Sequence, residues 1–185
     1  MKTVEPIRNA NKIKEVKNIL KQRGYRDYLL FSIGINTGLR ISDILKLKVE
    51  DVKDKSHIIL KEGKTKKTKR FFINEKLRED IDTYIFNKED RGFLFESRKT
   101  DDKGDPKAIS RNQAYNILKA VADEVGLDNI GTHSMRKTFG YHHYKKHKDV
   151  ALLQGIFNHS SPSVTLRYIG INQENQDNSV KEFYL

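Results

Sequence analysis

The sequence contains no cysteine, which excludes disulfide bonds and thiolate metal sites and is compatible with a reducing cytoplasm. It also lacks a long apolar run. Its most apolar stretch, residues 28–35, is far too short to span a bilayer, and the N-terminus has no apolar signal core. No internal repeat or low-complexity segment is present. With 185 residues, the chain is long enough for one domain with a proper core. We therefore expect a soluble, cytoplasmic protein of one domain.

Negative charge is in short supply. The chain has 25 Asp and Glu against 36 Lys and Arg, which gives a formal net charge of +11 and a pI near 9.6. Such an excess is expected of a protein that holds a phosphate backbone. A lysine-rich, solvated surface would give the same excess, so charge alone favours a nucleic-acid partner only modestly.

The spacing of apolar residues predicts a mainly helical α+β domain with a small antiparallel β-sheet. Ser110 and Gln113 form a capping-box pattern, and Pro162 stands where a last helix would begin. Residues 99–107 have the composition of a loop. Helices are predicted over residues 11–23, 26–35, 75–86, 110–125, 134–146 and 149–157, a short helix from Ser42, hairpin strands over 57–61 and 68–73, and an edge strand over 92–95.

The residues that suggest chemistry are Arg40 and a group late in the chain: His133, Arg136, His159 and Tyr168. Two arginines, two histidines and a tyrosine suit the attack of a phenolate on a phosphodiester. The guanidinium fork matches two phosphate oxygens and stays charged at any working pH. Tyrosine is a competent nucleophile once a neighbouring base or a cationic cluster favours its deprotonation.

Taken singly, these residues have ordinary structural explanations. Arg40 stands between Leu39 and Ile41, an apolar setting in which Asp43 would be the partner of a buried guanidinium, or the two would form an ordinary surface pair. A lone histidine near a helix start is more often structural than catalytic. His133 and Arg136, however, lie one helical turn apart and could meet one phosphate together.

Together, T-G-L-R-I-S-D around Arg40, H-S-M-R at residues 133–136, His159 and Tyr168 nine residues later resemble the catalytic domain of the tyrosine recombinases, the phage-integrase family. The resemblance spans about residues 27–170. It implies the DNA breaking-rejoining enzyme-like fold and a site-specific recombinase or integrase that cuts and rejoins DNA through a 3′-phosphotyrosyl intermediate. It further implies no cofactor and no metal.

The resemblance also implies a role for each matched residue. Tyr168 would be the nucleophile, Arg40 and Arg136 would clamp the phosphate, His133 would take the tyrosine proton and His159 would donate to a phosphate oxygen. Asp43 would support Arg40 rather than touch the substrate.

The predicted hairpin, residues 61–70, carries six basic residues. A solvated turn would explain this charge, but a β-hairpin also fits a DNA groove. The resemblance implies that Lys64 is the general acid for the leaving 5′ oxygen, with Lys66 as the alternative because the strand register cannot be derived from sequence. We expect DNA contacts from Lys66, Lys67, Lys69, Arg70, Arg111 and Lys137.

His142, His143 and His147 are the one group that suggests a metal, since residues 143 and 147 share a helix face. No cysteine and no H-E-x-x-H glutamate accompanies them, and the neighbouring lysines would repel a dication. We therefore expect a basic helix end and no metal.

Because only 39 residues precede Arg40, we expect one catalytic domain over residues 1–185, with a tail from about residue 171 and no separate N-terminal core-binding domain. The expected partner is double-stranded DNA, bound by a chain that is a monomer when free and a tetramer on paired sites. Two alternatives stay open: a non-catalytic DNA-binding module of the same fold, and a type IB topoisomerase-like strand passage.

Overall fold

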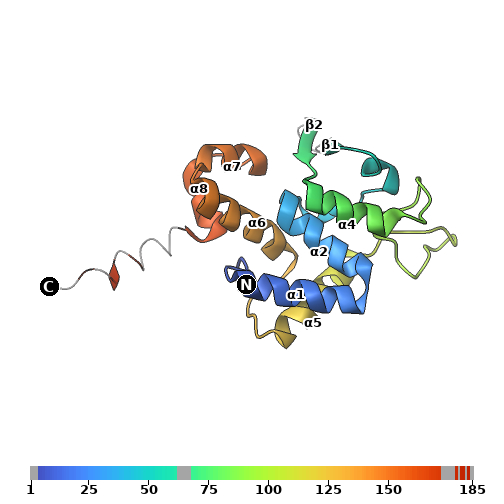
Figure 1. Cartoon of the computed structure of the whole chain (residues 1–185), viewed down its shortest axis with the longest axis horizontal. Coiled ribbons are helices and arrows are strands. Elements are labelled where there is room, and N and C mark those ends of the chain that lie inside the picture. The colour runs from blue at the N-terminus through green and yellow to red at the C-terminus, as the bar shows by residue number, and fades with distance from the viewer. Residues whose placement is uncertain (1–3, 62–67, 172–177, 179, 182, 184–185) are drawn as a thin grey trace.

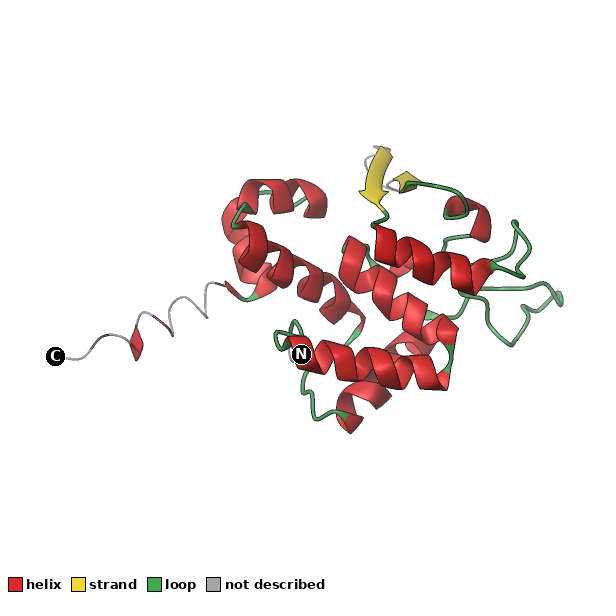
Figure 2. Cartoon of the chain, in the orientation of Figure 1, coloured by secondary structure: helices red, strands yellow, loops and turns green. Residues whose placement is uncertain are grey.

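The computed structural model describes residues 4–61, 68–171, 178, 180–181 and 183. Figure 2 shows helices throughout and one β-hairpin, which confirms the predicted fold class. The predicted helices are present, with ends displaced by at most two residues. The elements are α1 Ala10–Arg23, α2 Tyr25–Thr37, α3 Ile41–Ile44, a 3₁₀ turn Val49–Asp51, β1 His57–Lys61, β2 Thr68–Phe72, α4 Glu75–Ile85, α5 Arg111–Glu124, α6 Thr132–His147, α7 Val150–Phe157 and α8 Pro162–Ile169.

Local side chains begin several of these helices. The Asn9 side chain accepts hydrogen bonds from the first backbone amides of α1. The capping box predicted for α5 is confirmed: Ser110 Oγ accepts from Gln113 N at 3.1 Å, and Gln113 Oε1 accepts from Ser110 N at 2.8 Å. Ser161 caps α8, with Pro162 in its first turn.

Helix α2 is the centre of the main hydrophobic core. Leu29, Leu30 and Ile33 are fully buried, and the helix packs against α1, α4 and α6. The contact with α6 is close because Gly34 has no side chain: a Cβ there would lie 2.5 Å from Met135 Sδ. Any larger residue at position 34 would displace α6, and with it His133 and Arg136, from the core.

A second, smaller cluster joins the rest of α6 to α7 and α8, which lie together at one side of the molecule (Figure 1). We call the second half of α6 with α7 and α8 the C-terminal lobe. Its buried residues include Leu153, Phe157 and Ile169. Gly140 permits this packing, because a Cβ there would lie 2.7 Å from Phe157 and Ile169. Helix α6 therefore belongs to both cores and connects them.

The sheet has two antiparallel strands, with His57 opposite Phe72 and Lys61 opposite Thr68. The predicted edge strand over residues 92–95 is wrong. Phe93 makes only an isolated bridge to Lys48. The pairing cannot extend because the 3₁₀ turn begins directly after Lys48. Among the described helices, none has the length and apolar composition needed to cross a membrane.

Candidate active site

Arg136 lies at the lobe junction, where the C-terminal lobe meets the rest of the domain. Its side chain is buried, and its guanidinium donates from Nη1 to the Gly38 carbonyl and from Nη2 to the Phe157 carbonyl, the latter at 2.9 Å. Its Cζ stands 4.2 Å from the centroid of the Phe157 ring. Burial lowers the pKa of Arg136 to about 10, so the group stays charged at neutral pH. One side chain thus holds the end of α2 against the end of α7 while presenting positive charge.

Arg40 occupies the position before α3, in extended backbone. Its side chain is exposed, which excludes the first of the two settings considered for it, a guanidinium buried with Asp43. Successive side chains of an extended segment point in opposite directions. Leu39 and Ile41 therefore enter the core, while Arg40 faces outward. Its charge acts on Arg136, lowering that residue's pKa, whereas the negative charge of Asp43 raises it.

The two histidines come from different segments, His133 from α6 and His159 from the turn between α7 and α8. His133 is the second residue of α6, and part of its surface is in solvent. Desolvation, followed by the charges of Arg136 and Lys137, lowers its pKa. Burial and then the charges of Arg136 and Arg40 lower the pKa of His159. Both rings are therefore neutral at pH 7, the state in which an imidazole can accept a proton.

His159 is oriented by a buried threonine. Its Nδ1 lies 3.1 Å from Thr165 Oγ1, which is also 3.3 Å from the Ser161 carbonyl. The hydroxyl has a single proton. If Thr165 donates it to Nδ1, the neutral imidazole carries its own proton on Nε2; if Thr165 donates to Ser161, Nδ1 carries it instead. The threonine hydroxyl thereby selects the tautomer of His159.

Tyr168 is the seventh residue of α8, and its ring packs edge-on against Phe157 and His159, with centroid distances of 5.5 and 5.0 Å. Burial raises the pKa of Tyr168, and the charges of Arg136 and Arg40 act in the opposite direction. The phenol is therefore protonated in the free protein. A base must take this proton if the oxygen is to attack.

A pocket of about 500 Å³ opens beside these residues. Arg136 forms part of its wall, together with Asn158 and apolar groups of the hairpin. Its charged lining comprises six cations and one carboxylate: Arg40, Lys46, Lys61, Lys69, Arg111, Arg136 and Asp43. This balance suits an anionic ligand such as a phosphodiester.

The residues predicted to contact DNA are placed differently from one another. Lys69 and Arg111 line the pocket, and Lys69 Nζ donates to the Ile156 carbonyl at 3.2 Å, joining β2 to α7. Arg70 is exposed on the other face of β2, beside His57. Lys137 is buried. Lys64, Lys66 and Lys67 lie outside the described residues, so the assignments of the general acid and of these contacts remain predictions.

Sequence reasoning missed Thr165, Lys46 and Lys61 as parts of the site. Thr165 had a signal, because it stands one helical turn before Tyr168 on α8 and so shares its face. Lys61 had one as well, because it belongs to the basic hairpin, whereas Lys46 had none, since only tertiary packing brings it to the pocket. Among the histidines considered for a metal, His143 and His147 have ring centroids 4.7 Å apart and ring planes tilted by 45°. The described residues contain no group of three ligands suited to a metal ion.

Two arginines, two histidines and a tyrosine gather on a mainly helical scaffold beside a basic pocket, an arrangement that suits phosphoryl transfer. Residues 8–175 match the model of the phage integrase family, and the chain belongs to that family. It is 49% identical over 183 residues to the probable integrase/recombinase YoeC of Bacillus subtilis, covering 99% of this chain and 98% of that protein.

Other relatives are longer. Tyrosine recombinase XerA of Pyrococcus horikoshii is 28% identical over 173 residues, which cover 91% of this chain but only 59% of XerA. The crystal structure of a XerA recombinase superposes with a TM-score of 0.74 at 18% identity, covering all of this chain and 68% of that one. A post-cleavage complex of XerH recombinase with its difH substrate gives 0.71 at 21% identity, covering 98% and 54%. These structural likenesses concern the fold.

Proposed function

We propose that this protein is a site-specific DNA recombinase that cuts and rejoins strands through a 3′-phosphotyrosyl intermediate. The observation that carries the proposal is the position of Arg136: buried at the lobe junction, charged, beside the basic pocket and close enough to Tyr168 for its charge to act on the phenol. Membership of the phage integrase family supports the same function.

In the proposed cleavage step, Tyr168 Oη attacks the scissile phosphorus, and the bond from phosphorus to the 5′ oxygen breaks. His133 takes the phenolic proton, and Lys64, or alternatively Lys66, protonates the departing 5′ oxygen. Arg40 and Arg136 stabilise the charge that develops on the non-bridging oxygens. In this step Thr165 donates to Nδ1 of His159, so that the neutral ring has its proton on Nε2 and donates it to one of these oxygens. The reverse attack by a partner strand's 5′ hydroxyl restores a phosphodiester, because one ester bond is exchanged for another.

The test is covalent trapping on duplex DNA with a nick just 3′ of the cleavage position, where the short released strand diffuses away. Repeated sequences near the gene would be tested as candidate sites. Wild-type protein should accumulate an adduct that protease destroys, and Tyr168→Phe should bind the DNA with similar affinity and form none. A DNA-binding module of the same fold would give no adduct with either protein, and this result would overturn the proposal.

We further propose that the free chain is a monomer and that protomers assemble as a tetramer when DNA brings two sites together. In the tail, Val180 and Phe183 are exposed, so these apolar side chains are available to a neighbouring surface. Deleting residues 178–185 should spare cleavage of a single nicked site but impair the paired-site complex in light scattering. Equal loss of both activities would contradict this role.

A further inference from the structure

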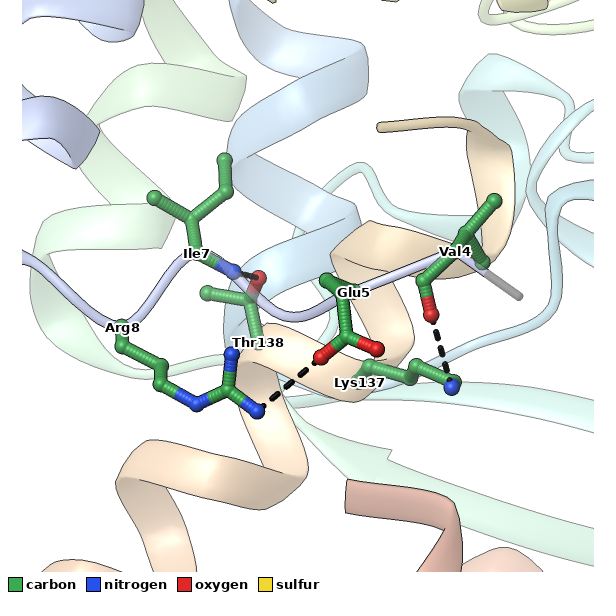
Figure 3. Close-up of polar contacts among 6 residues, drawn as sticks. All are labelled: Val4, Glu5, Ile7, Arg8, Lys137 and Thr138. Carbon is green, nitrogen blue, oxygen red and sulfur yellow. Dashed lines mark hydrogen bonds and ion pairs between the residues drawn. The ribbon is translucent and has the colours of Figure 1, made fainter. Parts of the chain in front are cut away.

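The first described residues form a strap across α6, the helix that carries Arg136 (Figure 3). We define the strap as residues 4–8. Its Ile7 N–H donates to Thr138 Oγ1 at 2.8 Å, and its Val4 carbonyl accepts from Lys137 Nζ at 2.8 Å. Because the Ile7 carbonyl is only an acceptor, His142 Nε2 donates to it, at 2.9 Å. Ile7 is itself buried, so the strap is anchored by packing as well as by hydrogen bonds.

Lys137 connects the strap to the nucleophile. Its side chain is only 7% exposed, and its Nζ stands 5.2 Å from the centroid of the Tyr168 ring. A buried ammonium requires partners. The Val4 carbonyl is one, and the negative charge of Glu5 opposes the effect of burial, which lowers the pKa of Lys137. The strap therefore supplies the environment that keeps this cation against the tyrosine ring.

The strap also contacts the end of α8. Gly170 terminates that helix two residues after Tyr168, with a φ of 77°. A Cβ at position 170 would lie 2.6 Å from Arg8 Nη2 and 3.8 Å from Glu5 Oε2. The paired side chains of Glu5 and Arg8, 3.0 Å apart, thus pack directly on this helix end. Two independent contacts, at Lys137 and at Gly170, join the strap to the segment that carries the nucleophile.

We propose that Lys137 is a positioning residue for Tyr168, and that the strap holds its ammonium against the tyrosine ring. This inference rests on the proposed function, in which Tyr168 attacks phosphorus. Phe157 and His159 already border the ring. A cation near the ring face restricts its remaining freedom, and a nucleophile must be held within about 0.5 Å of its productive position. Lys137 then acts through the tyrosine and does not contact the DNA.

The experiment compares Lys137→Met with Lys146→Met, which removes an exposed lysine from the same helix and serves as the matched control. Single-turnover cleavage of the nicked substrate is measured at saturating DNA. Lys137→Met should cleave about tenfold more slowly, the loss expected when one cation–π contact is removed. Its DNA affinity and salt dependence should match wild type. Lys137→Arg should recover most of the rate, and Lys146→Met should leave it unchanged.

The contribution of the strap is tested through Thr138→Val, which keeps the side-chain shape but removes the acceptor of the Ile7 N–H. This variant should slow cleavage several-fold without weakening DNA binding. In the Lys137→Met background it should have no further effect, because both changes act through one contact. Additive losses would show that the strap does not act through Lys137. If Lys137→Met fails to fold, Thr138→Val alone tests the proposal, and an unchanged cleavage rate in this variant would contradict it.

A different result would assign Lys137 to the DNA interface. If Lys137→Met weakened binding, lowered the salt slope by about one and left the saturated rate unchanged, the lysine would contact a phosphate and the proposal would be overturned. The contact between Lys137 and the Tyr168 ring can also be measured without DNA, from the ¹⁹F NMR signal of 3-fluorotyrosine at position 168. Lys137→Met should shift this signal and Lys146→Met should not. This readout separates a failure of the inference from a failure of the proposed cleavage.

Discussion

Replacing Arg136 with lysine keeps a positive charge at the lobe junction but removes the planar fork that holds two carbonyls. In the structure, Nη1 donates to the carbonyl of Gly38, at the end of α2, and Nη2 donates to the carbonyl of Phe157, in the C-terminal lobe. A lysine ammonium is a point charge on a flexible stem and cannot reproduce both bonds in the same geometry. The substitution therefore separates the structural role of Arg136 from its charge.

The size of the effect follows from burial. A hydrogen bond from a charged donor contributes about 1.5–3 kcal/mol, and at least one buried carbonyl would lose its partner, so we expect a loss of about 3 kcal/mol in the free energy of unfolding. For a domain of this size, that corresponds to a melting temperature lower by about 10 °C. Losing one donor to the developing phosphate charge should separately reduce cleavage by about 10²–10³.

The assay combines thermal unfolding with single-turnover cleavage, measured well below the melting temperature of the variant. Arg40→Lys is the matched control, because Arg40 is exposed and lines the same pocket. It should impair cleavage while leaving the melting temperature within about 2 °C of wild type. If Arg136→Lys were as stable as Arg40→Lys, the two carbonyl bonds would not hold the lobes together, and the reasoning would be refuted.

Three further predictions concern other parts of the site. Thr165→Val should slow cleavage about fivefold through the tautomer of His159, while Thr165→Ser should not; equal rates would exclude the hydroxyl as the orienting group. The melting temperature should rise with pH up to about 6.5 and then level off. Folding lowers the pKa of His133, His143 and His159 below the ordinary 6.5. Between the folded and the unfolded pKa values the unfolded chain therefore binds more protons, so stability increases as pH rises. His143→Asn should flatten this rise, and an unchanged slope would contradict the assignment. Lys64→Ala should be rescued by a sulfur leaving group, which needs no general acid; rescue of Lys66→Ala alone would move that role two residues along.

Much of the fold could be predicted because most of its helices are amphipathic and their start signals are local. Asn74 caps α4, Ser110 caps α5 and Ser161 caps α8 within a few residues of the apolar pattern they precede. The edge strand over residues 92–95 could not be judged locally, because its pairing depends on what Lys48 does in a distant segment. Strand pairing is a property of two segments, and a single pattern contains only one of them.

The types and order of the candidate residues were enough to predict which of them lie together, whereas their surroundings could not be predicted. The apolar neighbours of Arg40 left open whether its side chain is buried with Asp43 or lies at the surface, and in the structure the neighbours alone are buried. The surroundings of Lys137, which was expected to contact DNA, could not be derived from its place after Arg136, because one step along a helix turns a side chain by about 100°. That rotation directs Lys137 to the strap, whose contact with α6 spans more than a hundred residues of sequence.

The most direct test of the central claim is to identify the residue and the DNA end joined in the trapped adduct. After cleavage of the nicked substrate, proteolysis and mass spectrometry should recover the peptide that contains Tyr168, linked to a 3′ phosphate, and the released strand should end in a 5′ hydroxyl. Attachment through another residue, or a link to a 5′ phosphate, would contradict the assignment of Tyr168 as the nucleophile.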